Sequence, residues 1–82
     1  MVNGEFTLDG ADDRADLKII RVLGNKMAQL RMLQMGITPG TSVEVLRRAP
    51  LADPVEICVR GSKLLLRREE ARNIAVVRAD TP

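Results

Sequence analysis

Residues 33–45 end a helix, turn the chain and begin a strand within thirteen residues, and no other segment restricts the fold as strongly. Gly36 follows the helical run Lys26 to Met35 and can adopt the left-handed conformation that ends a helix. Pro39 and Gly40 suit the two central positions of a type II turn. The last four residues, Ser-Val-Glu-Val, alternate as in a half-buried strand. A helix followed this closely by a strand is typical of a small barrel with an inserted helix.

The composition indicates a single small domain with an aliphatic core. The chain has 82 residues, of which 45% are hydrophobic, with one Phe and no Trp or Tyr. A chain of this length holds one hydrophobic core, and here that core must consist of Val, Ile, Leu and Met. The single cysteine, Cys58, excludes a disulfide within the chain, so the fold does not require an oxidising compartment.

The N-terminal segment differs from the rest of the chain in charge. Residues 1–16 contain five acidic residues and one basic residue, whereas residues 17–82 contain twelve basic and six acidic residues. We expect residues 1–16 to be a flexible acidic segment, with an arm that transiently covers the basic face as the alternative. Residues 79–82 are expected to form a short tail. No apolar run has the length of a targeting or membrane-spanning segment, which predicts a cytoplasmic protein.

Short alternating or aliphatic segments predict about five strands. These segments are residues 17–23, 42–48, 55–60, 63–67 and 73–78. A helix over residues 26–35 follows the first strand, with Asn25 as its N-cap, and residues 68–72 have good helix formers for a single short turn. Gly61-Ser62 suits a two-residue type II′ hairpin turn. The prolines of residues 49–54 predict a rigid, exposed loop, and the expected fold is mainly β with one short inserted helix.

Four pieces of the chain, in this order, resemble one family. They are Met-Gly-Ile-Thr-Pro-Gly-Thr-Ser-Val-Glu-Val at 35–45, Asp53-Pro54, Leu-Arg-Arg-Glu-Glu-Ala at 66–71 and Ile-Ala-Val at 74–76. Together they are similar to the FeoA family, the small cytosolic partners of the ferrous iron transporter FeoB. The resemblance implies a small SH3-like barrel over residues 17–78, related to the C-terminal domain of iron-dependent repressors. Asp53 and Pro54 would form a structural turn, although Ala52 departs from the Gly that often precedes them in the family.

The function that the resemblance implies is that of a non-enzymatic accessory or regulatory protein of bacterial ferrous iron uptake. Such a protein would bind the cytosolic part of FeoB, at its GTP-binding domain or its membrane-proximal region, and would meet the membrane only through that partner. The residues agree with a binding module, because a chain without His has no Ser-His or Cys-His pair and no Gly-rich phosphate loop follows a strand. We expect no catalytic residue and no cofactor.

Ligands for iron are few in this sequence. Without His, no facial triad of two His and a carboxylate can form, and Cys58 has no second thiolate in the chain. The remaining oxygen donors are Glu44, Asp53, Glu56, Glu69 and Glu70. In strands and helical turns such carboxylates are more often solvated or paired with arginines, so we predict no intrinsic metal site. A family-level label of transition metal ion binding would follow from kinship with the repressor domain.

One face of the predicted helix is a candidate docking surface. Leu30 and Leu33 point one way, while Ala28, Met32 and Met35 form a ridge on another face at helical spacing. Methionine is a common core filler, so one interpretation is that this ridge packs against the barrel. The other is that it binds FeoB or a second copy of the chain.

Arginines form a second candidate surface. They lie at strand ends and around the short helical turn: Arg47, Arg48, Arg60, Arg67, Arg68 and Arg72. Such a set is usually a solvated face. As a functional surface, it would dock onto an acidic patch of the transporter's GTP-binding domain and make association salt-sensitive, and Arg47, Arg48, Arg67 and Arg68 are its main candidates.

The competing function is a repressor-like, nucleic-acid-binding or metal-responsive module, suggested by a basic small barrel. The absence of Trp and Tyr and of a recognition helix with an Arg, Asn or Gln face argues against nucleic-acid binding. We therefore expect no nucleic-acid partner.

Overall fold

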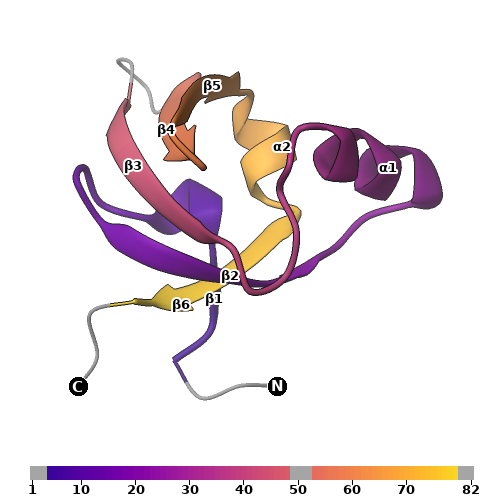
Figure 1. Cartoon of the computed structure of the whole chain (residues 1–82), viewed down its shortest axis with the longest axis horizontal. Coiled ribbons are helices and arrows are strands. Elements are labelled where there is room, and N and C mark those ends of the chain that lie inside the picture. The colour runs from indigo at the N-terminus through magenta and orange to yellow at the C-terminus, as the bar shows by residue number, and fades with distance from the viewer. Residues whose placement is uncertain (1–3, 49–52, 80–82) are drawn as a thin grey trace.

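The computed structural model describes residues 4–48 and 53–79 and forms a strongly curved antiparallel sheet with helices at one side (Figure 1). Along the chain the elements are β1 (Phe6–Thr7), the 3-10 turn η1 (Leu8–Gly10), β2 (Asp16–Val22), α1 (Lys26–Gln34), β3 (Ser42–Arg48), β4 (Val55–Val59), β5 (Ser62–Leu66), α2 (Arg68–Ala71) and β6 (Ile74–Arg78). The expected rigid loop at 49–54 falls largely outside the described residues, as does most of the 79–82 tail.

The six strands pair in the order β1-β6-β2-β3-β4-β5. Register shifts between Ile19 and Arg21 in β2, and between Val45 and Arg47 in β3, insert an extra residue on each strand. Such bulges bend a strand and increase its twist, which curls the sheet around one core. The predicted small SH3-like fold is confirmed, with one more strand than expected. In the described residues the edge strands β1 and β5 do not pair, so the sheet is not closed into a hydrogen-bonded barrel.

The additional strand comes from the segment that was expected to be flexible. Phe6 and Thr7 pair with Val76 and Ala75 of β6, and Leu8 is fully buried in the core. The sequence did not predict this strand, because Phe6 and Leu8 lie in a segment with five acidic residues, a composition typical of a flexible terminus. The folded unit therefore begins near residue 6 and not at residue 17.

The core is aliphatic, as the composition requires. Val55, Ile57 and Val59 of β4 are buried, while Glu56 and Cys58 between them lie on the outer face. The same alternation buries Leu17 and Ile19 of β2. The remaining buried hydrophobic side chains are Leu8, Ala11, Met32, Ile37, Val43, Val45, Leu66, Ala71, Ile74, Ala75 and Val76. The predicted period-two pattern is confirmed in β2 and β4, whereas β6 buries the consecutive residues Ile74, Ala75 and Val76.

The ends of α1 follow the sequence signals closely. The side chain of Asn25 accepts a hydrogen bond from the Ala28 amide at 2.9 Å, as an N-cap does. At the other end, the Ile37 amide donates to the Met32 carbonyl at 2.9 Å, and Gly36 has a φ of 82°. This is the hydrogen-bond pattern of a Schellman ending. Gly40 follows with a φ of 88°, as the predicted turn requires.

The hairpin between β4 and β5 turns one residue earlier than expected. Val59 pairs with Ser62, which leaves Arg60 and Gly61 as the two loop residues. Both have positive φ, 52° and 82°, as in a type I′ turn rather than the predicted type II′. The prediction assigned the turn to Gly61-Ser62 because arginine is an unusual residue at positive φ.

Among the residues that the structure describes, neither helix is long and apolar enough to cross a membrane.

Candidate docking surface

The helix α1 stands at one end of the molecule, beyond α2 as seen from the strands (Figure 1). It is apolar on two opposite sides. On the inner side Met32 is 2% exposed and belongs to the core cluster, and Met35 packs against that cluster. On the outer side Met27 is 76% exposed, Leu30 50% and Leu33 58%. A helix with apolar residues on both sides is usually covered on both sides.

The burial of Met32 corrects the hypothesis for the helix. Met32 is buried and Met35 packs against the core cluster, which favours the interpretation that this ridge packs on the rest of the domain, whereas Ala28 is half-buried and lines the hollow between α1 and α2. Leu30 and Leu33, which we set apart from that ridge, are the exposed side chains. The sequence shows two apolar stripes on this helix, and periodicity alone cannot tell which one faces the core.

The exposed large hydrophobic side chains are concentrated on and next to α1. Leu23, just before the helix, is 36% exposed, so four of the five exposed large hydrophobic residues in the described chain lie on or next to α1. The fifth is Leu65 on β5. We call Leu23, Met27, Leu30 and Leu33 the outer face of α1. Single exposed leucines are common on protein surfaces, but a group of this kind often marks an interaction site.

Two hollows flank this outer face. One has a volume of about 580 Å³ and lies between α1, the end of β2 and the turn at Thr38 and Pro39. The second has a volume of about 390 Å³ and lies between α1 and α2. Arg31 of α1 and Glu70 of α2 approach to 3.3 Å beside this second hollow. The outer face therefore forms a raised apolar strip with a depression on each side.

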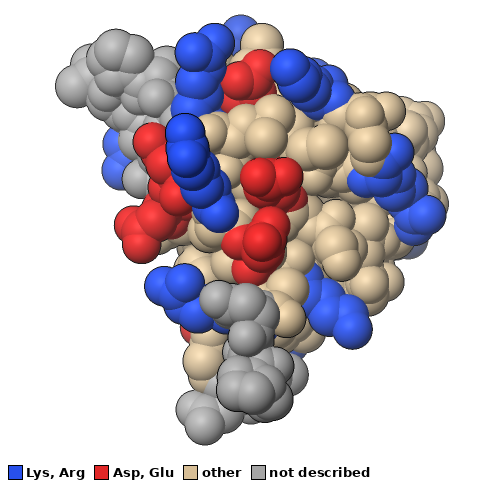
Figure 2. Space-filling view, turned by 60° about the vertical axis from the view of Figure 1, so that its left-hand side comes forward, with Lys and Arg blue, Asp and Glu red and all other residues tan. Residues whose placement is uncertain are grey.

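The predicted arginines do not form one continuous patch. Arg47 pairs with Glu56 at 3.1 Å across β3 and β4, and Arg72 approaches Asp9 at 3.7 Å. Arg60 donates to the side chains of Thr38 and Thr41. Figure 2 shows basic and acidic side chains interspersed over one face of the molecule. Arg48 ends β3, and its side chain lies outside the described part of the structure.

Among the predicted arginines whose side chains the structure describes, Arg67 and Arg68 are exposed and take part in no ion pair. Their side chains lie at the start of α2. Their backbone amides do form hydrogen bonds within the protein. The Arg68 amide donates to the Asp53 carboxylate at 3.1 Å, and the Arg67 amide donates to the Glu70 carboxylate at 2.9 Å. The Asp53 side chain thus holds the start of α2, a contact that its expected place in a turn did not include, and Pro54 follows it directly before β4.

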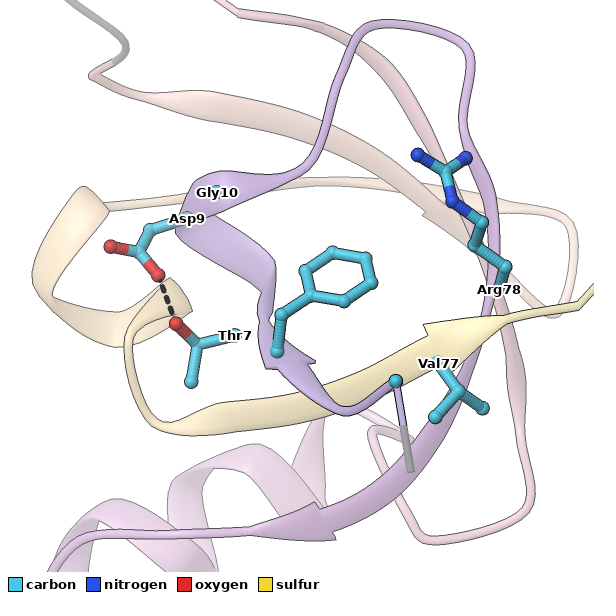
Figure 3. A pocket seen from close by; sticks show the side chains of 7 residues that line it. Thr7, Asp9, Gly10, Val77 and Arg78 are labelled. Atoms are coloured by element: carbon cyan, nitrogen blue, oxygen red, sulfur yellow. Dashed lines mark hydrogen bonds between the residues drawn. The ribbon is translucent and has the colours of Figure 1, made fainter. Parts of the chain in front are cut away.

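Another hollow, of about 670 Å³, lies beside β1 and β6, with Thr7 and Asp9 on one side and Arg78 on the other (Figure 3). The Thr7 hydroxyl donates to the Asp9 carboxylate at 2.5 Å, and Arg72 also approaches that carboxylate. The acidic group is therefore already engaged within the protein. This hollow could not be predicted from the sequence, because its residues come from both ends of the chain.

The candidate metal ligands remain apart. No group of three or more Cys, Asp or Glu side chains in the described ranges could hold a metal ion. Glu56 and Glu70 face arginines, and Asp53 accepts a backbone amide. Cys58 lies half-buried on the outer sheet face, in register with Glu44 on β3 and Lys63 on β5.

Comparison with known proteins places this fold in a family. Residues 6–78 match the model of the FeoA domain. The chain is 40% identical over 58 residues to an Fe(2+) transport protein A/Fe(2+) transporter FeoB fusion protein of Porphyromonas gingivalis. This match covers 71% of the chain but 7% of the fusion protein.

Solved structures agree with the family match. An FeoA-like protein from Clostridium acetobutylicum superposes with a TM-score of 0.88 at 26% identity, covering 99% of this chain and 94% of that one. The FeoA protein of Chlorobium tepidum gives a TM-score of 0.85 at 28% identity, with 94% and 73% covered. A manganese-dependent transcriptional repressor shares the fold, with a TM-score of 0.86 at 18% identity over 95% of this chain and 44% of that one. The family match over residues 6–78 and these superpositions lead to one conclusion: the chain belongs to the FeoA domain family.

Proposed function

We propose that this protein is a non-catalytic accessory component of ferrous iron transport, which acts by associating with the cytosolic part of an FeoB-type transporter. The observation that carries the proposal is the relative in which an FeoA segment and the FeoB transporter form one chain. Covalent fusion keeps two modules at a fixed ratio and a high local concentration, which is useful when they work in contact. In a separate chain, association must replace the covalent link.

The surface of the protein supports a binding role. It has an uncovered apolar strip on α1, and the exposed Arg67 and Arg68 offer positive charge at the start of α2. Charged groups at the edge of an interface mainly raise the rate of association and make it sensitive to salt. We propose Arg67 and Arg68 as such peripheral contacts, directed at an acidic surface of the transporter's GTP-binding domain.

The test compares the transporter with and without this protein. FeoB in lipid nanodiscs is assayed for binding of the purified protein, and for GTP turnover and Fe(II) uptake after reconstitution into vesicles. We expect saturable binding and a change in turnover or uptake at saturation. Absence of binding at concentrations up to the millimolar range would contradict the proposed function.

A separate comparison of association rates tests whether Arg67 and Arg68 contact the transporter. Arg67→Ala combined with Arg68→Ala should slow association several-fold at low ionic strength, with little difference at high salt. Arg47→Ala is the matched control, because Arg47 already pairs with Glu56 on the neighbouring strand. Equal association rates for all three proteins at low salt would remove the arginines from the interface.

A further inference from the structure

We infer that the outer face of α1 is the docking site for an amphipathic helix of the transporter, one with an apolar stripe and with acidic side chains on the flank that faces β2. This inference rests on the proposed function and specifies the part of the surface that carries it.

The spacing of the exposed side chains favours a helical occupant. Met27, Leu30 and Leu33 follow one another at intervals of three residues on a regular helix, and the exposed Leu23 lies just before that helix. Residues at such spacing form a ridge that packs beside the ridge of a second helix. A partner helix laid along α1 would bury Leu30 and Leu33 together with one of the flanking hollows.

The hollow next to β2 has the right lining for such a contact. Its apolar lining includes Val22, Leu30, Leu33, Ile37 and Pro39. Ile37 is itself buried and fixed by the Schellman ending of α1. The floor is therefore preformed by the scaffold, which lowers the ordering cost of binding. A partner side chain could enter this hollow without displacing any element of the sheet.

The charges around the strip determine the chemistry of the partner. No acidic residue is present in α1, which carries Lys26 and Arg31. The lining of the hollow beside β2 also lacks acidic residues and includes Arg21 and Lys26. Arg21 pairs with Glu5 and Arg31 with Glu70, whereas Lys26 has no ion pair in the described part of the chain. The hollow on the other side, between α1 and α2, has Glu69 and Glu70 in its lining, so the cationic border lies on the β2 side of the strip. That border is complementary to a helix with acidic side chains on the flank that faces β2.

The same charges disfavour a second copy of this chain as the occupant. In a two-fold symmetric dimer the same patch is used by both subunits. Two copies in contact through the β2 side of the outer face would each place Lys26 and Arg21 against a surface whose lining has no acidic residue. Like charges at an interface are unfavourable, so the strip fits an acidic partner better than itself.

The decisive variant is Leu30→Gln combined with Leu33→Gln. Both side chains are at least half exposed, so the fold should persist, as circular dichroism and a thermal melt can verify. Binding to FeoB in nanodiscs should weaken at least tenfold. Leu65→Gln is the matched control, since Leu65 is a similarly exposed leucine on β5, and it should bind as the wild type does.

A second variant tests the charge argument. Lys26→Glu changes the first residue of α1, where a carboxylate also favours the helix dipole, so the fold is preserved. It should reduce affinity several-fold at low salt, and the difference should shrink at high salt. Lys63→Glu on β5 is the control for net charge and should leave affinity nearly unchanged.

The outcomes separate the inference from the proposed function. If the wild type binds FeoB and the double leucine variant binds equally well, the docking site is wrong while the proposed function stands. If the wild type does not bind FeoB, both the docking site and the proposed function are wrong. Sedimentation of the wild type with anionic vesicles lacking FeoB, lost in the double variant, would replace the inference with a membrane contact. Concentration-dependent dimerisation lost in the same variant would replace it with self-association.

Discussion

The guanidinium of Arg60 donates to the Thr41 hydroxyl at 3.2 Å, which joins the tip of the β4–β5 hairpin to the turn between α1 and β3. The Thr41 and Thr38 hydroxyls are themselves 2.8 Å apart, so the contact continues into the turn that follows α1. Arg60 has a φ of 52°, which most residues with a side chain avoid. The hydrogen bonds to the turn stabilise an arginine in this unfavourable backbone conformation.

Two substitutions at Arg60 should separate these effects. Arg60→Ala removes the hydrogen bonds and keeps a residue with a side chain at positive φ, so we expect a loss of about 1 kcal/mol in the free energy of unfolding. Arg60→Gly also removes the hydrogen bonds but relieves about 1 kcal/mol of backbone strain, so it should be nearly neutral. Urea denaturation measures both. A glycine variant less stable than the alanine variant would contradict this balance.

The glycines at positive φ should differ in their tolerance of alanine. Gly40→Ala places a Cβ in open space, so the cost is the backbone strain alone, about 1 kcal/mol. Gly24→Ala also brings a Cβ to 3.1 Å from the Asn73 side chain and 3.2 Å from the Ala28 Cβ. We expect it to cost about 2 kcal/mol or more. Thermal melts rank the two, with Gly10→Ala as the control, because Gly10 has open space and no positive φ. Equal melting temperatures for the two variants would show that the Asn73 side chain moves away from the added Cβ without loss of stability.

Truncation of a side chain should lower the stability far more on the inner face of α1 than on its outer face. Met32→Ala removes a side chain that is buried in the core and should lower the free energy of unfolding by about 2 to 5 kcal/mol. Met27→Ala removes an exposed side chain and should change it by less than about 0.5 kcal/mol. Chemical denaturation of both variants checks the orientation of the helix. A larger effect at Met27 would mean that α1 packs with its other face inward.

The N-terminal segment should contribute to stability through Leu8. This side chain is fully buried, so Leu8→Ala should cost about 2 to 5 kcal/mol, as for other core leucines. Asp12→Ala serves as the control, because Asp12 is exposed in the same segment. If Leu8→Ala unfolds at the same urea concentration as the wild type, residues 6–11 do not belong to the core. Hydrogen exchange of the Val76 region would then show no added protection from β1.

Local signals were sufficient for much of the scaffold. The Asn25 cap, the Gly36 helix end and the Pro39-Gly40 turn depend on neighbouring residues, and each was predicted from its own few positions. The hairpin was misplaced by one residue because Arg60 occupies a conformation for which the sequence favours glycine. Hydrogen bonds to Thr38 and Thr41, which are distant in the sequence, stabilise Arg60 in this conformation. Turn preferences based on neighbouring residues do not include such contacts.

The sequence by itself determined the resemblance to the family, the aliphatic core and the order of helices and strands from β2 onward. The resemblance rests on four short pieces of sequence, and the core and the order of elements follow from backbone conformations and side-chain periods that act over a few residues. The tertiary structure alone decided that Leu8 completes the core and that α1 packs through Met32, leaving Leu30 and Leu33 exposed. Both stripes of α1 are apolar, so the hydrophobic effect favours burial of either one. The choice depends on the position of the helix relative to the sheet, which long-range packing establishes.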